Sequence, residues 1–299
     1  MNGVVAITGA EGQLGRALTT RLGPLALACS RRDCDITSAK SIRTMLDAAI
    51  RAGRHPEVLI NAAAYNAVEA AEGEREAAFA INAEGPRHLA AACAERQIRF
   101  VQISTDYVFG NGPAPSSGWR ETDVPICRCV YAESKRAGEL AVLDCCGSSA
   151  LSALVVRTCG LYGAPAAQGK RSFVEAILQR AAAGQPLRVV NDQRCTPTSV
   201  DDLVVALLQL LATPAEGLVH VVNAGSCTWY EFAREILRLA GIEANITPIP
   251  SAELNQRAAR PVDSRLCTEL YERTTGHLLP TWKTALAARL RDDGKLGAA

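Results

Sequence analysis

The stretch VVAITGAEGQLG, residues 4–15, decides the fold. An apolar run followed by Gly9, Gly12 and Gly15 in a GxxGxxG pattern predicts a buried strand that turns directly into a helix. We expect Gly9 to permit the tight turn, Gly12 to let a cofactor backbone approach, and Gly15 to let the helix pack on the strand. Such a junction leaves backbone N–H groups free at a helix N-terminus, where a dinucleotide pyrophosphate can bind.

The alternation begun by this stretch continues through the first half of the chain. Short apolar runs at residues 4–7, 25–29, 58–61, 100–104 and 154–157 predict strands. Between them, residues 13–22, 39–52, 75–97 and 133–143 carry apolar side chains at helical spacing. Continuously apolar strands indicate a parallel sheet covered on both faces. The predicted fold class is therefore a Rossmann-type, doubly wound α/β sheet.

The last third changes character and predicts a smaller, lid-like substrate domain. Residues 203–211 and 229–240 are predicted helices, residues 219–223 a strand and residues 247–261 an irregular segment. Turn formers predict loops at 110–118 and 160–169. We assign residues 1–158, with late sheet elements from about 196–224, to a dinucleotide-binding domain, and residues 159–195 and 225–299 to a C-terminal substrate domain.

Composition excludes several classes of protein. The 299 residues are 48% hydrophobic, which is enough for a real core, and 32 Lys and Arg balance 31 Asp and Glu at a formal charge of +1. This balance provides no basic field for nucleic acid or for a membrane surface, so a small-molecule partner is expected. The apolar stretch 203–212 is too short to span a bilayer, and the N-terminus does not resemble a signal peptide, so we expect a cytoplasmic protein.

The eleven cysteines contain no CxxC pair and have no histidine at zinc-site spacing. We expect no metal site and no disulfide framework, with most of the thiols acting as small buried hydrophobes.

The end of the second predicted strand bears on cofactor choice. The acidic residue that would bind a ribose 2′-hydroxyl is missing there, and the chain instead continues as Ser30-Arg31-Arg32. Two arginines favour a 2′-phosphate, hence NADPH with NADH as the alternative, unless this is only a solvated charged loop or Asp33 counteracts the arginines. Asp35 and Ile36 would lie at the adenine edge.

Three residues form a candidate catalytic set. Thr105 ends the fourth predicted strand, and Tyr131 opens the next helix four residues before Lys135. The YxxxK spacing stacks the two side chains on one helical face, so we expect the Lys135 ammonium to lower the pKa of the Tyr131 phenol and to hold the nicotinamide ribose. Thr105 would bind a reacting carbonyl oxygen, and Tyr131 would donate a proton to it as hydride arrives.

With these motifs the sequence resembles the extended short-chain dehydrogenase/reductases, and within them the dTDP-4-dehydrorhamnose reductases. The similarity covers almost the whole chain and includes the blocks INAAAYNAVEAAE from residue 60, FAINAEGPRHLA from 79, ISTDYVF from 103, VYAESKRAGE from 130, VVRTCGLYG from 155, VVNDQRCTPTSVDDL from 189, TWYEFA from 228 and ARPVDSRLCT from 259.

The resemblance implies NADPH-dependent reduction of the 4-keto group of a dTDP-4-dehydro-6-deoxyhexose in deoxysugar biosynthesis. It implies the catalytic set Thr105, Tyr131 and Lys135. Around the cofactor it implies Gly12, Gln13, Leu14, Asp35, Ile36, Ala62, Ala63, Tyr65, Tyr131 and Lys135. For the nucleotide-sugar it implies Val68, Thr105, Asp106 and Arg260, the last as a diphosphate anchor.

Departures from the family pattern concern the sugar. Rhamnose-forming members usually carry a tryptophan where this chain has Gly160, and a threonine and a lysine where it has Asn66 and Ala70. These changes suggest a reshaped pocket around Gly160 and a 4-keto sugar other than the rhamnose precursor, unless they are tolerated drift.

Two other functions are alternatives: a non-catalytic regulatory subunit of the methionine adenosyltransferase beta type, and a nucleotide-sugar epimerase. The sequence leaves a homodimer open.

Overall fold

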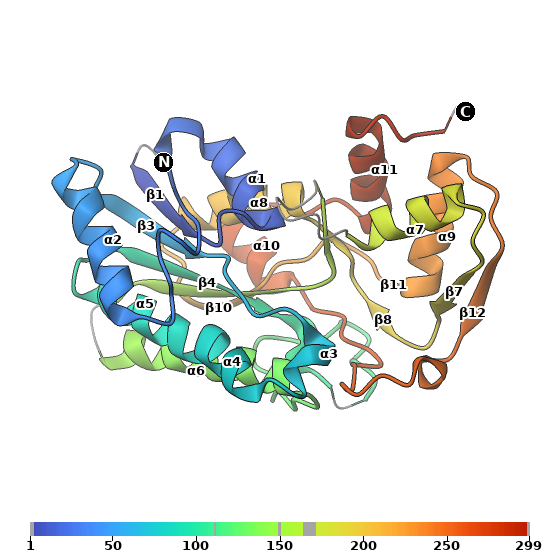
Figure 1. The fold of residues 1–299 in the computed structure, drawn as a ribbon, viewed down its shortest axis with the longest axis horizontal. Coiled ribbons are helices and arrows are strands. Elements are labelled where there is room, and N and C mark those ends of the chain that lie inside the picture. Colours follow the sequence, from blue (N-terminus) through green and yellow to red (C-terminus); the bar gives the residue numbers. More distant parts are fainter. Residues whose placement is uncertain (1–2, 111, 149–150, 164–171, 298–299) are drawn as a thin grey trace.

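The computed structural model describes residues 3–110, 112–148, 151–163 and 172–297. Six parallel strands form one sheet in the order β10-β5-β4-β3-β1-β2 (Figure 1). Their bounds are β1 Val4–Thr8, β2 Ala26–Cys29, β3 Pro56–Asn61, β4 Arg99–Thr105, β5 Ala153–Thr158 and β10 Gly217–His220. The strand order reverses beside β1, which opens a crevice at the carboxyl ends of the strands. The predicted doubly wound parallel sheet is confirmed.

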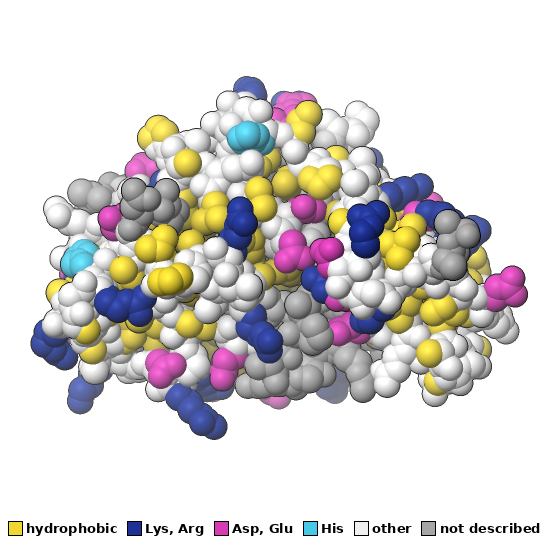
Figure 2. Space-filling view, turned by 90° about the horizontal axis from the view of Figure 1, so that it is seen from above, with side chains coloured by type: hydrophobic (Ala, Val, Ile, Leu, Met, Phe, Trp, Pro, Cys, Tyr) yellow, Lys and Arg dark blue, Asp and Glu magenta, His cyan; other side chains and the backbone are white. Residues whose placement is uncertain are grey.

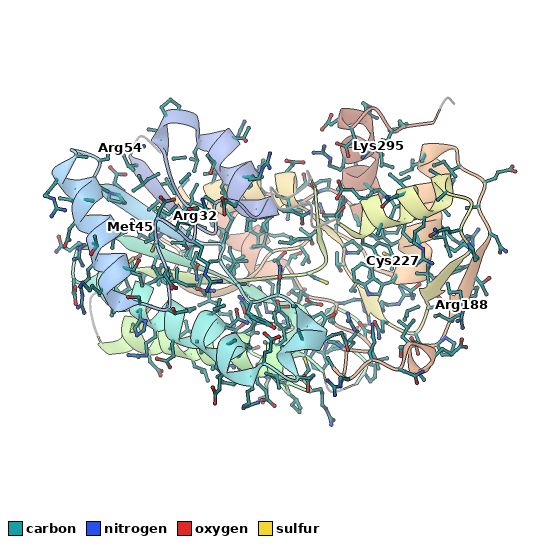
Figure 3. All side chains as sticks on the ribbon, in the orientation of Figure 1. Arg32, Met45, Arg54, Arg188, Cys227 and Lys295 are labelled. Atoms are coloured by element: carbon teal, nitrogen blue, oxygen red, sulfur yellow. The ribbon has the colours of Figure 1, made fainter. Side chains whose placement is uncertain are left out.

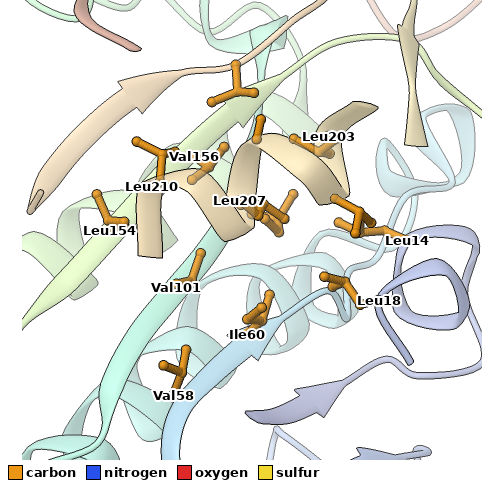
Figure 4. Packing of buried hydrophobic residues seen from close by; sticks show 14 of the residues in the cluster. Leu14, Leu18, Val58, Ile60, Val101, Leu154, Val156, Leu203, Leu207 and Leu210 are labelled. Atoms are coloured by element: carbon orange, nitrogen blue, oxygen red, sulfur yellow. The ribbon is translucent and has the colours of Figure 1, made fainter. Parts of the chain in front are cut away.

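Helices cover both faces of this sheet because successive strand residues point to opposite sides. Val5 and Ile7 pack in the cluster formed with α1 and α8, whereas Ala6 packs in the cluster formed with α2, α5 and α6. Figure 4 shows leucines of α1 and α8 seated on Val58, Ile60, Val101 and Val156. The helices are α1 Gln13–Leu22, α2 Ala39–Arg51, α5 Gly85–Ala94, α6 Val130–Ser148, α8 Val200–Leu211 and α10 Glu269–Thr275.

The single helix predicted for residues 75–97 is divided. The short α3 (Val68–Ala71) precedes α4 (Arg75–Phe79), and a π-helical turn, Ala80–Glu84, joins α4 to α5. Pro86 has no N–H to donate to the Asn82 carbonyl one turn earlier, so the regular ladder is interrupted there. Gly138 of α6 packs at that point, where an added Cβ would lie 2.0 Å from the Asn82 carbonyl oxygen. The apolar periodicity alone does not reveal this interruption.

A second part of the chain lies to the right of the sheet in Figure 1. Its core is aromatic: Phe232 contacts Tyr162, Phe173 and Trp282. The elements are α7 Phe173–Ala182, α9 Trp229–Ala240, α11 Trp282–Asp292, β7 Leu187–Val190, β12 Ile246–Ile249, β8 Arg194–Cys195, β11 Cys227–Thr228, β6 Leu161–Tyr162 and β9 Thr198–Ser199.

Two predictions in this region are wrong in detail. The segment 247–261 is not wholly irregular, because β12 pairs in parallel with β7. The strand predicted at 219–223 runs instead from Gly217 to His220. Beyond it, the Asn223 side chain accepts from the Ser199 N–H and donates to Asp202 and to the Pro280 carbonyl, so the chain leaves the sheet to join α8 to the segment before α11.

The two predicted loops differ in outcome. Residues 110 and 112–118 contain no helix or strand. The loop predicted at 160–169 includes the short strand β6, and its residues 164–169 lie outside the described part of the chain.

Four general properties concern the cysteines, metal-binding groups, helix length and surface charge. Eight cysteines are buried, and no disulfide joins cysteines in the part of the chain that the structure describes. The same residues contain no group of His, Cys, Asp and Glu side chains suited to a metal ion. None of the helices in the described ranges is both long and apolar enough to cross a membrane. On the face shown in Figure 2, basic and acidic side chains are interspersed.

Candidate active site

A cavity of about 620 Å³ opens at the carboxyl ends of β1, β3, β4 and β5. This volume is typical of small-molecule sites. Segments far apart in the sequence meet there: the glycine turn after β1, the end of β4 at Thr105, and Tyr131 and Lys135 at the start of α6. The parallel sheet brings them together because all its strands end on the same edge.

The glycine turn fits its predicted geometry. Gly9 has φ +71°, and a Cβ there would lie 2.5 Å from the Ala63 backbone nitrogen. A Cβ on Gly15 would lie 2.2 Å from the Gly9 carbonyl oxygen, so Gly15 lets α1 pack against the turn, and it does not line the cavity. Gly9, Gly12, Gln13 and Leu14 do line it. Gly12 is the N-cap of α1 and supplies no side chain, which leaves N–H groups available to a ligand.

The segment after β2 contributes fewer cavity residues than predicted. Arg31 lines the cavity, whereas Ser30 and Arg32 do not. The Asp33 carboxylate accepts hydrogen bonds from the Ser30 N–H at 2.8 Å and from the Ser30 hydroxyl at 2.6 Å, which closes a local turn. Arg32, labelled in Figure 3, is exposed on this turn beside Asp33. Ser30 and Arg32 thus lie outside the cavity wall in this structure, and their assignment to the cofactor stays a prediction.

Further along the wall, Asp35, Ile36, Ala62 and Ala63 line the cavity as predicted. The Asp35 carboxylate accepts from the N–H and hydroxyl of Thr37, and these bonds lower its pKa.

Tyr65 does not line the cavity, contrary to prediction. Its hydroxyl donates to Glu74 at 2.8 Å, and its N–H donates to the Asn82 side chain. These local partners hold the tyrosine beside the cavity wall.

Thr105, Tyr131 and Lys135 line the same cavity. A hydrogen bond with the Thr105 side chain favours the ionised Tyr131 phenol, but burial dominates and raises the Tyr131 pKa above its ordinary value. The Lys135 ammonium donates to the Ile103 carbonyl oxygen at 2.6 Å. The net pKa of Tyr131 is therefore raised, opposite to the lowering predicted from Lys135.

Burial also lowers the pKa of Lys135 to about 8, although the nearby Glu139 carboxylate opposes the shift. The unfolded chain then holds this proton up to pH 10.5 while the folded chain loses it near pH 8. Raising the pH through this window should therefore stabilise the wild type relative to Lys135→Met by about 3 kcal/mol. Urea unfolding of both proteins at several pH values measures the difference. A difference that does not change with pH would show that Lys135 keeps its ordinary pKa.

Asp106 and Val68 line the cavity as predicted. Asp106 is 3% exposed, accepts from the Cys159 thiol at 3.0 Å and from the Thr105 hydroxyl at 3.2 Å, and has a pKa raised by burial.

Gly160 also lines the cavity and has φ +52°. An added Cβ would lie 3.3 Å from the Trp229 ring and from Pro197. Trp229 packs on Phe173 at a centroid distance of 4.8 Å, so an aromatic ring of the second part already stands beside this glycine.

Arg260 does not line the cavity. Its guanidinium donates to the Tyr107 hydroxyl at 3.1 Å and to Glu69 at 3.2 Å. The anionic partner of Arg260 in this structure is therefore Glu69, whereas the predicted partner is a diphosphate.

Comparisons with known proteins agree with this geometry. The sequence matches the RmlD substrate binding domain family over residues 2–294. The chain belongs to this family. It is 38% identical to a dTDP-4-dehydrorhamnose reductase of Streptomyces griseus over 290 residues, which is 94% of this chain and 90% of the relative. It is 36% identical to a probable dTDP-4,6-dihydroxy-2-methyloxan-3-one 4-ketoreductase of Streptomyces antibioticus, covering 96% of this chain and 94% of that one.

A solved structure shares the fold. The crystal structure of dTDP-4-dehydrorhamnose reductase from Bacillus anthracis in complex with NADP superposes with a TM-score of 0.88 at 34% identity, covering 98% of this chain and all of that one. The predicted resemblance is confirmed by these findings.

Two pairs of residues at this site were not predicted from the sequence: Thr158 with Cys159, and Glu139 with Arg157. Thr158 and Cys159 line the cavity at the end of β5. Next to Lys135 on α6, Glu139 binds Arg157 in a fully buried ion pair at 2.7 Å and accepts from the Ser104 hydroxyl. Two sequence signals were available: Thr158 ends an apolar strand, and Glu139 follows Lys135 by one helical turn.

Proposed function

We propose that this protein catalyses the NADPH-dependent reduction of the 4-keto group of a dTDP-4-dehydro-6-deoxyhexose in deoxysugar biosynthesis. The observation that carries the proposal is the meeting of Thr105, Tyr131 and Lys135 in one cavity with the glycine turn. The name of the Streptomyces griseus relative and the NADP in the Bacillus anthracis structure support the activity and the cofactor.

The residues present fit a dinucleotide. The Gly9 turn packs against the Ala63 backbone too closely for a Cβ, Gly12 lines the cavity without a side chain, and the buried Gln13 Nε2 lines it with no partner among the described residues. The pyrophosphate would be held by Gly12, Gln13 and Leu14. The rest of the dinucleotide would lie against Asp35, Ile36, Ala62 and Ala63. NADPH supplies the hydride when bound.

The catalytic set then provides binding and the proton. Burial keeps the Tyr131 phenol protonated at neutral pH, and this is the form that can donate to a carbonyl oxygen. Thr105 would hydrogen-bond the same oxygen, and Lys135, fixed on the Ile103 carbonyl, would place a positive charge beside the phenol and the ribose.

We assign the sugar to the region bordered by Val68, Asp106 and Gly160, at the junction of the sheet with the part built by 159–195 and by 225–299 apart from α10, which packs on the sheet. The sheet part, 1–158 with about 196–224, would hold the cofactor. Arg260 would bind a diphosphate only after exchanging its Glu69 contact for the ligand.

Arg31 should select NADPH over NADH. It lines the cavity, so we expect Arg31→Ala to weaken NADPH binding about 10-fold or more and NADH binding little, because only NADPH has a 2′-phosphate. Dissociation constants from fluorescence titration measure both effects.

Arg32→Ala is the matched control for Arg31→Ala and should change neither constant, since Arg32 lies outside the cavity. Equal losses for both cofactors in Arg31→Ala would contradict a 2′-phosphate site.

The proposed activity is tested by the loss of reduced-nicotinamide absorbance with dTDP-4-dehydro-6-deoxyglucose, with and without a 3,5-epimerase. Turnover that requires the epimerase would identify a rhamnose-type reductase, and turnover without it would identify a different 4-keto sugar. NADPH binding without turnover of either sugar would favour the regulatory alternative.

A further inference from the structure

Two buried polar atoms in the cavity wall have no partner among the described residues: Gln13 Nε2 and Thr158 Oγ1. The other buried side-chain atoms without a partner in the described ranges belong to residues outside the wall. A buried hydroxyl that bonds to nothing is costly in free energy, and a ligand that supplies the missing bond recovers this cost on binding. Gln13 begins α1, at the phosphate end proposed above. The proposed function assigns no ligand contact to Thr158.

Thr158 lies at the opposite, reactive end of the cavity. It is the last residue of β5, is 4% exposed, and stands in register with Thr105 on β4. Threonine hydroxyls thus end two neighbouring strands at the same edge, and the side chain of Thr105 already binds Asp106 and the Tyr107 N–H.

Strand alternation places Thr158 on the same side of the sheet as the glycine turn, and its register partner Thr105 lies on this side too. Leu154 and Val156 alternate with Thr158 along β5 and pack in the cluster formed with α1 and α8. Arg157 points the other way, to Glu139 of α6. Thr158 therefore belongs to the α1 side, where the glycine turn begins, whereas Tyr131 and Lys135 approach from α6.

A ligand group that meets Thr158 must be polar and must lie at the far end from the pyrophosphate. The carboxamide of a nicotinamide ring meets both conditions, and its N–H and C=O suit a hydroxyl that can accept or donate. We propose that the Thr158 hydroxyl binds the nicotinamide carboxamide and fixes the orientation of the ring toward Tyr131. This inference rests on the proposed function, because it requires a nicotinamide cofactor.

Thr158→Val tests the inference, since it removes only the hydroxyl and keeps the branched shape. The hydroxyl has no protein partner among the described residues, so the variant should fold as the wild type does. We expect its dissociation constant for NADPH to rise about 3- to 10-fold, the effect of one neutral hydrogen bond. Binding of 2′-phospho-ADP-ribose, which lacks the nicotinamide, should change less than about twofold by the same arithmetic.

Thr198→Val is the matched control. Thr198 is also fully buried, but it lies outside the cavity wall and donates to the Thr196 carbonyl. We expect it to leave the ratio of the two dissociation constants at the wild-type value.

Three outcomes would overturn the inference: equal weakening of both ligands by Thr158→Val, no weakening of either, or a change confined to the KM of the sugar. Since the titrations contain no sugar, they stay informative even if the wild type binds NADPH and reduces no 4-keto sugar. That result would count against the proposed function alone. A wild type that binds neither ligand would overturn both.

Discussion

Tyr131→Phe lowers kcat/KM by about 10²- to 10⁴-fold if Tyr131 is the proton donor, the usual contribution of a positioned acid. The substitution removes a hydroxyl whose pKa is raised by burial and which therefore carries its proton at neutral pH. The ring remains, and with it the edge-to-face contact with Tyr107 at 5.5 Å. We expect the free energy of unfolding and the NADPH dissociation constant to stay near their wild-type values.

The control for this substitution is Tyr162→Phe. Tyr162 is a buried tyrosine outside the cavity wall, and its hydroxyl has no partner among the described residues, so its loss should leave turnover unchanged. Steady-state rates with NADPH and the 4-keto sugar compare the two variants. If Tyr131→Phe kept wild-type activity, the proton-donor assignment would be wrong.

Glu139→Gln should lower the free energy of unfolding by about 3–5 kcal/mol. The Glu139 carboxylate and the Arg157 guanidinium are both fully buried and joined by two hydrogen bonds of 2.7 and 2.8 Å. The amide keeps the shape but leaves the Arg157 charge without its counter-ion. The neighbouring His220 cannot replace the lost negative charge, because an imidazole is either neutral or cationic; burial and Arg157 lower its pKa to about 3 and keep it neutral.

An exposed ion pair provides the control. Glu84→Gln removes one partner of a contact with Arg87 in which both side chains are 52% exposed, so we expect a change of about 1 kcal/mol or less. Urea unfolding followed by tryptophan fluorescence measures both variants. Equal small losses of unfolding free energy would mean that the buried Glu139–Arg157 pair contributes no more to stability than the exposed pair does.

The elements predicted best are those in which local sequence and tertiary packing agree. A Cβ on Gly9 or on Gly15 would clash with backbone atoms of the turn, and α1 begins and ends where its apolar periodicity does. Thr105, Tyr131 and Lys135 follow from strand ends and helix spacing, so their meeting in one cavity was predictable.

The predicted site residues that do not line the cavity have one feature in common, a competing partner that the local pattern does not reveal. Asp33 closes the turn that removes Ser30 and Arg32 from the cavity wall. Glu74 takes the Tyr65 hydroxyl, and Glu69 takes Arg260. In the same way, the Ile103 carbonyl takes the Lys135 ammonium that was expected to act on Tyr131. Two of these four pairings, Glu69 with Arg260 and Ile103 with Lys135, join residues distant in sequence and so depend on the tertiary fold.

The central claim is that hydride passes from NADPH to the keto carbon of a dTDP-linked sugar in this cavity. Its most direct test is a single turnover with NADPH deuterated at the transferring position of the nicotinamide C4, followed by mass and NMR analysis of the sugar. The account predicts one deuterium at sugar C4, with a newly formed hydroxyl on the same carbon. A sugar recovered unreduced, or reduced without deuterium at C4, would contradict it.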